Sequence, residues 1–299
     1  MVFKSSLSIV SQPFVCKTMF SLLKKLFCPS PLSTHFDVLE KLGSGGYGKV
    51  YLARRRQDDK KVALKKIKKN KIRDFVQSPV GDVPLEIYIA MMLSHPNIIR
   101  TSGFLKSGKS WCLVMDHCVG YMDLTSFIQM NKSISEQTAR KIFIQTYKAL
   151  THCFKQNVVH RDVKADNILV HWSTHDVKLI DFGVSTFVHA DTLIEDSRGT
   201  DIFMPPEFFL THQYNPLRGT VWAMGCLLYC MVYGEVPFCN VHEVVTMTPT
   251  FRDITSSRGD ISGQYCVDLL QRMLEPCEEE RVTYKNISYH PWVTREKLY

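Results

Sequence analysis

The sequence reads HRDVKADN at residues 160–167 and KLIDFG at residues 178–183. Each segment adjoins a short run of β-branched and aliphatic residues, at 168–170 and 177–180, and such runs predict strands. Two acidic residues and one amide are therefore expected close together, each beside a predicted strand.

The residue types in these segments suit the chemistry of metal-bound phosphate. Hard cations such as Mg²⁺ take oxygen ligands, so Asn167 and Asp181 can hold the metal while Asp162 accepts a proton from an incoming hydroxyl. Lys164 would place its positive charge beside the phosphoryl group that is transferred. A chance polar loop would explain either segment alone, but it poorly explains both in this order and at this spacing.

The pattern H-R-D-x-K-x-x-N followed by D-F-G resembles the catalytic and metal-binding loops of protein kinases. The resemblance implies an α+β, bilobal fold with a kinase domain at about residues 35–293. A small β-rich N-lobe with one main helix would occupy about 35–117, and a large, mostly helical C-lobe about 118–293. Residues 1–34 would form a basic, flexible N-terminal extension and residues 294–299 a C-terminal tail.

The N-terminal extension leaves other interpretations open. It contains no acidic residue, a bias that signal and transit peptides share. The interruption SQP at 11–13 argues against a signal peptide, and no uninterrupted apolar stretch approaches the roughly 20 residues that span a bilayer. Residues 19–27 could form a short basic amphipathic helix at a membrane surface, and Met19 could be the true start.

The composition is that of a globular chain, with 45% hydrophobic and 22% charged residues among 299. A formal net charge of +8 would suit a nucleic-acid partner, but aromatic and basic residues do not alternate as in stacking surfaces, and no nucleic acid is expected. Ten cysteines without a C-x-x-C pair predict a reducing, intracellular location, cytoplasmic or nuclear, and no zinc site. We expect a monomer.

Residues 43–48 read GSGGYG, and Val50 follows. Glycines at this spacing let backbone N–H groups approach phosphate oxygens without obstruction by Cβ atoms. A dinucleotide-binding turn shares the pattern but needs a helix at the last glycine, and here residues 50–53 continue as a strand. The better resemblance is to the G-x-G-x-x-G-x-V loop that covers ATP in protein kinases.

The strand predicted at 62–65, VALK, resembles the kinase strand that carries a phosphate-binding lysine. A helix predicted at 83–93 contains one acidic residue, Glu86, which is the candidate partner of Lys65; an exposed helix carboxylate is the alternative. Met115 would be the gatekeeper beside the adenine ring. The ATP site implied by the resemblance consists of Leu42, Gly43, Ser44, Gly45, Gly46, Tyr47, Gly48, Val50, Ala63, Lys65, Glu86, Met115 and Leu169.

Residues 181–207 have the length of a kinase activation segment. Members of the family bury an ion pair beneath this segment, which implies that Glu207 pairs with Arg281. Arg161 could bind a phosphorylated hydroxyl of the segment, or an acidic side chain could serve without modification. The candidate hydroxyls are those of Ser185, Thr192 and Ser197, and the candidate acids are Asp191, Glu195 and Asp196.

The nearest group by resemblance is the Pim kinases. Three features carry it: KIRDF at 71–75 with VPLE at 83–86, DLTSFI at 123–128, and FMPPE at 203–207. The resemblance implies a serine/threonine kinase that transfers the γ-phosphate of ATP, with Mg²⁺, to protein substrates.

Three acids align with those that Pim-like kinases use to hold basic residues upstream of the acceptor. They are Asp123, Asp166 and Glu243, and each could equally be a solvated surface carboxylate. A preference for basic substrate motifs is therefore an expectation that rests on the resemblance alone.

Thr220 departs from the common kinase pattern. Most kinases carry an aspartate there, two residues before the tryptophan in D-x-W-x-x-G, and it accepts hydrogen bonds from the catalytic-loop backbone. A hydroxyl accepts more weakly, so roughly 1–3 kcal/mol of loop rigidity could be missing. The alternative function is therefore a catalytically impaired pseudokinase that acts as an ATP-binding scaffold. Pim kinases also lack that aspartate, which favours an active enzyme.

Overall fold

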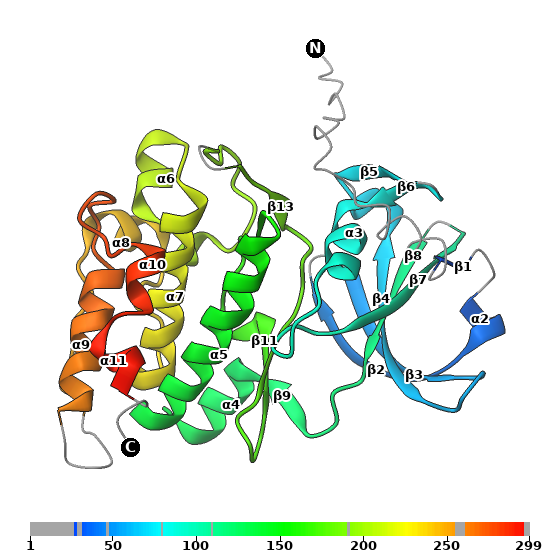
Figure 1. The fold of residues 1–299 in the computed structure, drawn as a ribbon, viewed down its shortest axis with the longest axis horizontal. Helices are drawn as coiled ribbons and strands as arrows, with labels where there is room; N and C mark the ends of the chain where they lie inside the picture. Colours follow the sequence, from blue (N-terminus) through cyan, green and yellow to red (C-terminus); the bar gives the residue numbers. More distant parts are fainter. Residues whose placement is uncertain are drawn as a thin grey trace. The chain divides into compact units, whose positions relative to one another are not determined.

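The structure is a computed structural model that describes residues 27–28, 32–45, 48–78, 80–108, 110–189, 192–254 and 261–295. The chain forms two compact units, the first ending at Val119 and the second beginning at Gly120 (Figure 1). Strands dominate the first unit and helices the second, so the predicted α+β class is confirmed. Within the described ranges, every helix is too short or too polar to traverse a bilayer.

A six-stranded sheet in the order β1-β7-β8-β4-β3-β2 organises the first unit. Its strands are β1 (Phe27–Cys28), β2 (Phe36–Gly45), β3 (Gly48–Arg55), β4 (Lys61–Lys68), β7 (Thr101–Ser107) and β8 (Ser110–Asp116). Neighbours are antiparallel, apart from β1, which runs parallel to β7. Strand β1 and the first three residues of the short helix α2 (Leu32–His35) lie in the segment 1–34, for which the sequence predicts a flexible extension.

Alternation along β4 separates the two faces of this sheet. Val62 and Leu64 belong to a buried cluster with residues of β2, β3, β7 and β8, and Leu32 of α2 packs against it. Lys65 follows Leu64 and therefore faces the opposite side, because successive side chains of a strand alternate. Burial of each large apolar side chain contributes about 1.5–3 kcal/mol, which holds the strand of Lys65 in the middle of the sheet.

The main helix of the first unit is α3 (Leu85–Met92). It follows the 3₁₀ turn η1 (Lys69–Lys71) and a hairpin of β5 (Phe75–Ser78) and β6 (Gly81–Pro84). The helix predicted from residue 83 begins two residues later, because Val83 and Pro84 pair with β5. Every residue of α3 except Glu86 and Met92 is buried, so the helix is fixed by packing on nearly all sides.

The second unit is mainly helical. Its helices are α4 (Leu124–Asn131), α5 (Glu136–Lys155), α6 (Pro206–Thr211), α7 (Pro216–Tyr233), α8 (Val241–Thr246), α9 (Ser262–Met273), α10 (Tyr284–Ile287) and α11 (Pro291–Thr294). Its short strands are β9 (Tyr121–Asp123), β10 (Val158–Val159), β11 (Ile168–His171), β12 (Val177–Leu179) and β13 (Thr186–Phe187), with 3₁₀ turns η2 (Ala165–Asn167) and η3 (Asp201–Phe203).

Helix α7 forms the centre of the second unit. The Asn215 side chain accepts from the backbone N–H groups of Leu217 and Arg218 and begins the helix, and Gly234, with a left-handed backbone, ends it. Fourteen of its eighteen residues are buried. Such all-round burial makes α7 a rigid support for the turns that pack against it.

Candidate active site

Two antiparallel ladders bring the two sequence segments together. Strand β10 pairs with β13, and β11 pairs with β12. Residues 160–167, the HRD loop, join β10 to β11, and residues 181–183, the DFG turn, follow β12. The backbone N–H of Ile180 donates to the carbonyl of Asn167 at 2.9 Å, so the two turns lie side by side.

Asp162 is 8% exposed and gathers several donors. Its Oδ2 accepts from Asn167 Nδ2 at 2.7 Å and lies 3.1 Å from Lys164 Nζ. Its Oδ1 accepts from the Thr200 hydroxyl at 2.7 Å, and Lys164 Nζ also donates to that hydroxyl at 2.6 Å. The carboxylate is thus oriented toward a hydroxyl group, beside an ammonium group that can neutralise phosphate charge.

His160 supports the loop from beneath. It is 1% exposed, its Nε2 lies 3.0 Å from the carbonyl oxygen of Ile180, and its Nδ1 accepts from the backbone N–H of Asp162 at 3.3 Å. This geometry assigns the neutral tautomer with hydrogen on Nε2, which donates to Ile180. Burial lowers the pKa of His160, so the ring stays neutral while it ties the HRD loop to the strand before the DFG turn.

Asn167 and Asp181 provide the oxygen ligands expected for a hard cation. Because the amide nitrogen of Asn167 donates to both the carboxylate and the carbonyl of Asp162, its amide oxygen is the atom that can ligate a metal. Asp181 has a left-handed backbone with φ of 64°, and its Oδ1 accepts from the N–H of Gly183 at 3.0 Å. One carboxylate oxygen and one amide oxygen would suit Mg²⁺, a hard cation that prefers oxygen ligands.

Arg161 reaches into the activation segment. Its side chain is 2% exposed and forms an ion pair with Asp196, whose backbone carbonyl accepts a further bond from Arg161 at 3.1 Å. Arg198 Nε lies 3.0 Å from the other carboxylate oxygen of Asp196. Of the three candidate acids, Asp196 is therefore the one on Arg161; Glu195 is exposed, and Asp191 lies outside the described residues.

The predicted pair beneath the segment is present. Arg281 donates to both carboxylate oxygens of Glu207 at 2.8 Å, and the arginine side chain has no exposed surface. Glu207 lies in the first turn of α6, which connects the activation segment to the core of the second unit.

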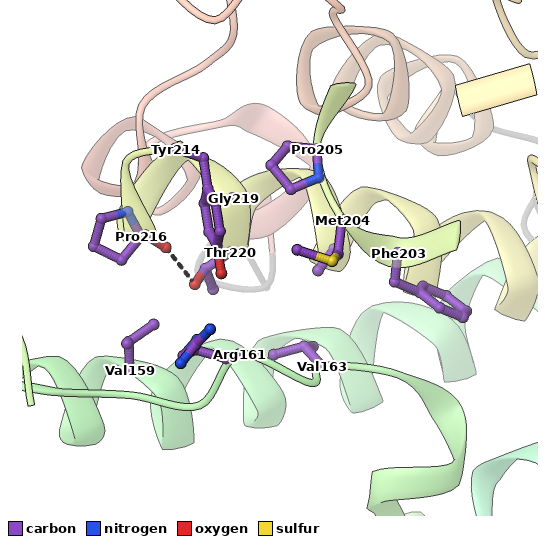
Figure 2. Close-up of a pocket in the computed structure, with 11 residues that line it drawn as sticks. Val159, Arg161, Val163, Phe203, Met204, Pro205, Tyr214, Pro216, Gly219 and Thr220 are labelled. Carbon is purple, nitrogen blue, oxygen red and sulfur yellow. Dashed lines mark hydrogen bonds between the residues drawn. The ribbon is translucent and has the colours of Figure 1, made fainter. Parts of the chain in front are cut away.

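The hydroxyl of Thr220 forms its hydrogen bond within its own helix, α7. Its Oγ1 donates to the carbonyl of Pro216, one turn earlier in α7, at 2.7 Å (Figure 2). Threonine hydroxyls make this bond readily inside helices. The aspartate that most kinases carry at position 220 accepts hydrogen bonds from the catalytic-loop backbone, whereas this bond stays within α7.

In the first unit, Lys65 and Glu86 form the predicted ion pair, with Nζ 2.6 Å from Oε1. Register places Val50 opposite Lys65 and Ala63 opposite Met115, so the three predicted apolar residues lie on adjacent strands. Leu42 is 46% exposed, as suits a residue that would cover a ligand. Leu169 belongs to β11 of the second unit and is partly buried.

The glycine-rich turn joins β2 to β3. Gly45 pairs with Gly48 and Ser44 with Lys49, while Gly46 and Tyr47 lie outside the described residues. A Cβ atom at Gly48 would lie 2.5 Å from the carbonyl oxygen of Lys66, so packing requires glycine there. Nothing lies within 4 Å of a Cβ at Gly43, which leaves its backbone open to approach.

The three candidate substrate acids have different surroundings. Asp123 caps α4 and accepts from the backbone N–H and hydroxyl of Ser126, both at 2.8 Å. Glu243 accepts from Cys239 N and Asn240 Nδ2, both at 2.7 Å, and thereby closes the start of α8. Asp166 is exposed beside the HRD loop.

Sequence reasoning gave no role to two residues of this site. Thr200 joins Asp162 and Lys164, and Tyr214 lines a small cavity together with Arg161 (Figure 2). The sequence offered one signal for Thr200, its position next to Gly199 and seven residues before Glu207. It offered no signal for Tyr214.

Comparisons with known proteins agree with this arrangement. The protein kinase domain profile matches residues 36–293. Serine/threonine-protein kinase pim-2 of Danio rerio is 34% identical over 268 residues, which cover 86% of this chain and 84% of that protein. Serine/threonine-protein kinase prk-2 of Caenorhabditis elegans is 30% identical over 275 residues, 90% of this chain and 60% of that protein. The PAS domain-containing serine/threonine-protein kinase of Mus musculus is 31% identical over 90% of this chain, which spans 19% of its length.

Proposed function

The chain belongs to the protein kinase family as a serine/threonine kinase close to the Pim group, and we propose that it transfers the γ-phosphate of Mg-ATP to protein serine and threonine hydroxyls. The observation that carries the proposal is the group around Asp162: a carboxylate 2.7 Å from the hydroxyl of Thr200, with the Lys164 ammonium 3.1 Å away. The Thr200 hydroxyl sits where a substrate hydroxyl would need to approach the same carboxylate.

In this proposal Asp162 orients the acceptor hydroxyl and takes its proton. Lys164 neutralises negative charge that develops on the phosphoryl oxygens as the bond to the leaving phosphate breaks. Asn167 keeps the Asp162 carboxylate in position through its amide nitrogen. Because little covalent chemistry falls to the protein, such positioning supplies most of the rate enhancement.

Lys65, held by Glu86, would bind the α- and β-phosphates, and the backbone of residues 43–48 would cover the triphosphate. Asn167 and Asp181 would hold Mg²⁺, which supplies positive charge across the phosphates when bound. The apolar residues Leu42, Val50, Ala63, Met115 and Leu169 would line the adenine site.

The Arg161–Asp196 pair supports activity without phosphorylation of the activation segment. Arg161 is already bound to a carboxylate, the role that a phosphate plays in kinases that need modification. Ser185, one of the three candidate hydroxyls, is 3% exposed and donates to the carbonyl of His160, so it is poorly placed for modification.

A preference for basic residues in the substrate is a further part of the proposal. Asp166, which is exposed, is the strongest of the three acids, because Asp123 and Glu243 already cap helices. A peptide array should show higher incorporation with arginine or lysine upstream of the acceptor, and Asp166→Asn should reduce that preference. Equal labelling of basic and neutral peptides would contradict it.

The central test is phosphoryl transfer from Mg-ATP to an arginine-rich serine peptide. Asp162→Asn and Asp181→Ala should each abolish transfer, while Asp176→Asn, which removes a carboxylate from the turn before β12, should not. If the folded wild type binds ATP but transfers nothing to peptide or to itself, the pseudokinase scaffold becomes the better description.

A further inference from the structure

Charge is divided unequally between the two units. Residues 1–119 contain 20 lysine and arginine residues against 8 aspartate and glutamate residues, whereas residues 120–299 contain 17 against 21. The excess of positive charge therefore belongs to the first unit. A surface that gathers this charge would attract an anionic partner.

Strand register places four lysines on one face of the six-stranded sheet. Lys49 of β3 lies directly opposite Lys66 of β4. Lys68 follows two residues after Lys66 and shares its face, and Lys41 of β2 lies opposite Tyr51, two residues from Lys49. All four lysines are exposed, and we call Lys41, Lys49, Lys66 and Lys68 the lysine face.

The fold does not use the charges of the lysine face. Within the described residues, no ion pair joins any of the four lysines to an acid. Like charges directly opposite each other in a sheet repel, so Lys49 and Lys66 give the sheet no stability. Asp116 of β8, an acid on the same face, lies opposite Val62 at the other end of β4. The lysine face is therefore available to an anion from outside the chain.

The lysine face lies on the side of the sheet away from the proposed ATP site. Val62 and Leu64 alternate with Lys65 along β4 and share the side of the lysine face, where Leu32 packs against their cluster. Lys65 points to the other side, where it pairs with Glu86 of α3. A partner on the lysine face would therefore leave Lys65 uncovered.

The N-terminal segment joins the described chain close to the lysine face. One row of paired residues crosses the sheet through Lys66 of β4, Cys112 of β8, Leu105 of β7 and Cys28 of β1. At about 4.8 Å between neighbouring strands, Cys28 lies about 14 Å from Lys66. Residues 1–26, which precede β1, contain four lysines and no acidic residue. Further positive charge is therefore attached to the same side of the sheet.

An anionic lipid surface is the partner that fits these features. It is extended and presents many negative charges, so it can meet lysines from three strands at the same time. The segment 19–27, for which the sequence allows a basic amphipathic helix, would add apolar contact, and stable attachment to a bilayer takes two such signals. Val38 of β2 lies on the same face opposite Ala53 and is 49% exposed, which supplies apolar surface beside the lysines.

We propose that the lysine face, together with the basic N-terminal segment, docks the first unit on an anionic lipid surface. The docking is electrostatic and reversible, because the four lysines are exposed and are not matched by acids of the sheet face around them. It adds a binding activity to the proposed phosphoryl transfer and does not depend on it.

The test is sedimentation of the full chain with vesicles of phosphatidylcholine, with or without about one third phosphatidylserine. We expect binding to the anionic vesicles that is lost between about 0.1 M and about 1 M salt, where the Debye length falls from about 10 Å to about 3 Å. Lys66→Gln combined with Lys68→Gln should weaken binding about 25-fold, as for two lysines near an anionic surface. Lys41→Gln combined with Lys49→Gln, on the two neighbouring strands, should have a similar effect.

The matched control is Lys148→Gln combined with Lys155→Gln, which removes the same charge from exposed positions of α5 and should keep wild-type binding. Three results would overturn the proposal: equal binding to neutral and anionic vesicles, wild-type binding by both variants of the lysine face, or binding to a duplex oligonucleotide without binding to the vesicles.

Phosphorylation of the soluble serine peptide without lipid separates this proposal from the proposed function. The variant Lys66→Gln with Lys68→Gln should keep the wild-type kcat, because neither side chain belongs to the proposed active site; the same result shows that the variant is folded. Vesicle binding by a chain that transfers no phosphate would support the docking and refute the proposed function. Phosphate transfer by a chain that ignores anionic vesicles would do the reverse.

Discussion

Lys65 with Glu86 in the first unit and Arg281 with Glu207 in the second form two ion pairs of nearly equal burial. The side chains of the first pair are 7% and 11% exposed, and those of the second are 0% and 11% exposed. Lys65 meets its partner through one ammonium nitrogen at 2.6 Å, whereas Arg281 meets both oxygens of its partner at 2.8 Å. The two pairs differ in their cation, and the difference matches their roles.

The guanidinium of Arg281 is saturated by the protein. Besides Glu207 it donates to the carbonyls of Glu275 and Pro276, and it lies 4.9 Å from the ring centre of Trp222. A planar fork held in this way cannot turn toward a ligand. An ammonium group is a point charge on a flexible stem, so Lys65 can add phosphate oxygens to its contacts while it stays on Glu86. The first pair therefore suits ligand binding and the second suits support.

The largest expected effect comes from breaking the ion pair of Arg281 with Glu207. Arg281→Met should lower the free energy of unfolding by about 3–5 kcal/mol, because it leaves the Glu207 carboxylate buried without its partner. Denaturant unfolding of the variant measures the loss. Arg252→Met is the matched control, since its pair with Glu235 is more than half exposed and should contribute less than about 1 kcal/mol.

The same pair can be removed as a unit. Arg281→Met combined with Glu207→Leu leaves no uncompensated charge and should recover a large part of the lost stability. If Arg281→Met unfolds at the wild-type denaturant concentration, the pair does not support the fold and the comparison fails.

Lys65→Met should separate activity from stability. We expect kcat/KM for ATP to fall about 10²- to 10³-fold, because a charge on the transferring phosphates is lost. The free energy of unfolding should fall by less than it does in Arg281→Met, because Arg281→Met removes two bonds to Glu207 and also leaves the carbonyls of Glu275 and Pro276 without their arginine donor. Lys66→Met removes the neighbouring exposed lysine and should change neither quantity. A stability loss as large as that of Arg281→Met would show that both pairs are structural.

The sequence predicts both pairs and the HRD loop, because these segments carry motifs that resemble those of protein kinases. VALK and the lone acid of the next helix identify Lys65 and Glu86. The pair of Glu207 with Arg281 is what the resemblance to protein kinases implies. The α+β class is likewise what that resemblance implies.

The contacts that the sequence does not predict depend on the orientation of individual side chains. The pattern N-x-x-E at 240–243 is a helix-capping signal and could have shown that Glu243 is already bonded. No local signal directs the Thr220 hydroxyl to Pro216 rather than to the HRD loop, or selects Asp196 for Arg161 across 35 residues of chain. Such contacts follow from tertiary packing, which propensity and periodicity do not encode.

His160 differs from the two ion pairs, because it is a buried titratable side chain that stays neutral. Burial lowers its pKa, with the bond to the Ile180 carbonyl opposing, so the unfolded chain takes up the proton first. Stability should therefore fall as pH decreases below the unfolded pKa of about 6.5, by at most about 1.4 kcal/mol per pH unit. Unfolding free energies between pH 7.5 and 5.5 should show a smaller slope in His160→Gln than in the wild type. Equal slopes in His160→Gln and in the wild type would contradict the assignment.

Thr220→Val has the smallest expected effect, because it removes one hydrogen bond between two uncharged groups. The hydroxyl bonds to the carbonyl of Pro216, which in a helix also receives the backbone N–H four residues on, so its loss leaves no buried acceptor unsatisfied. We expect a change below about 1 kcal/mol in the free energy of unfolding and less than about 2-fold in kcat. A fall in kcat without a loss of stability would show that the hydroxyl itself positions the HRD loop, whereas an unchanged kcat would confine its role to the bond within α7.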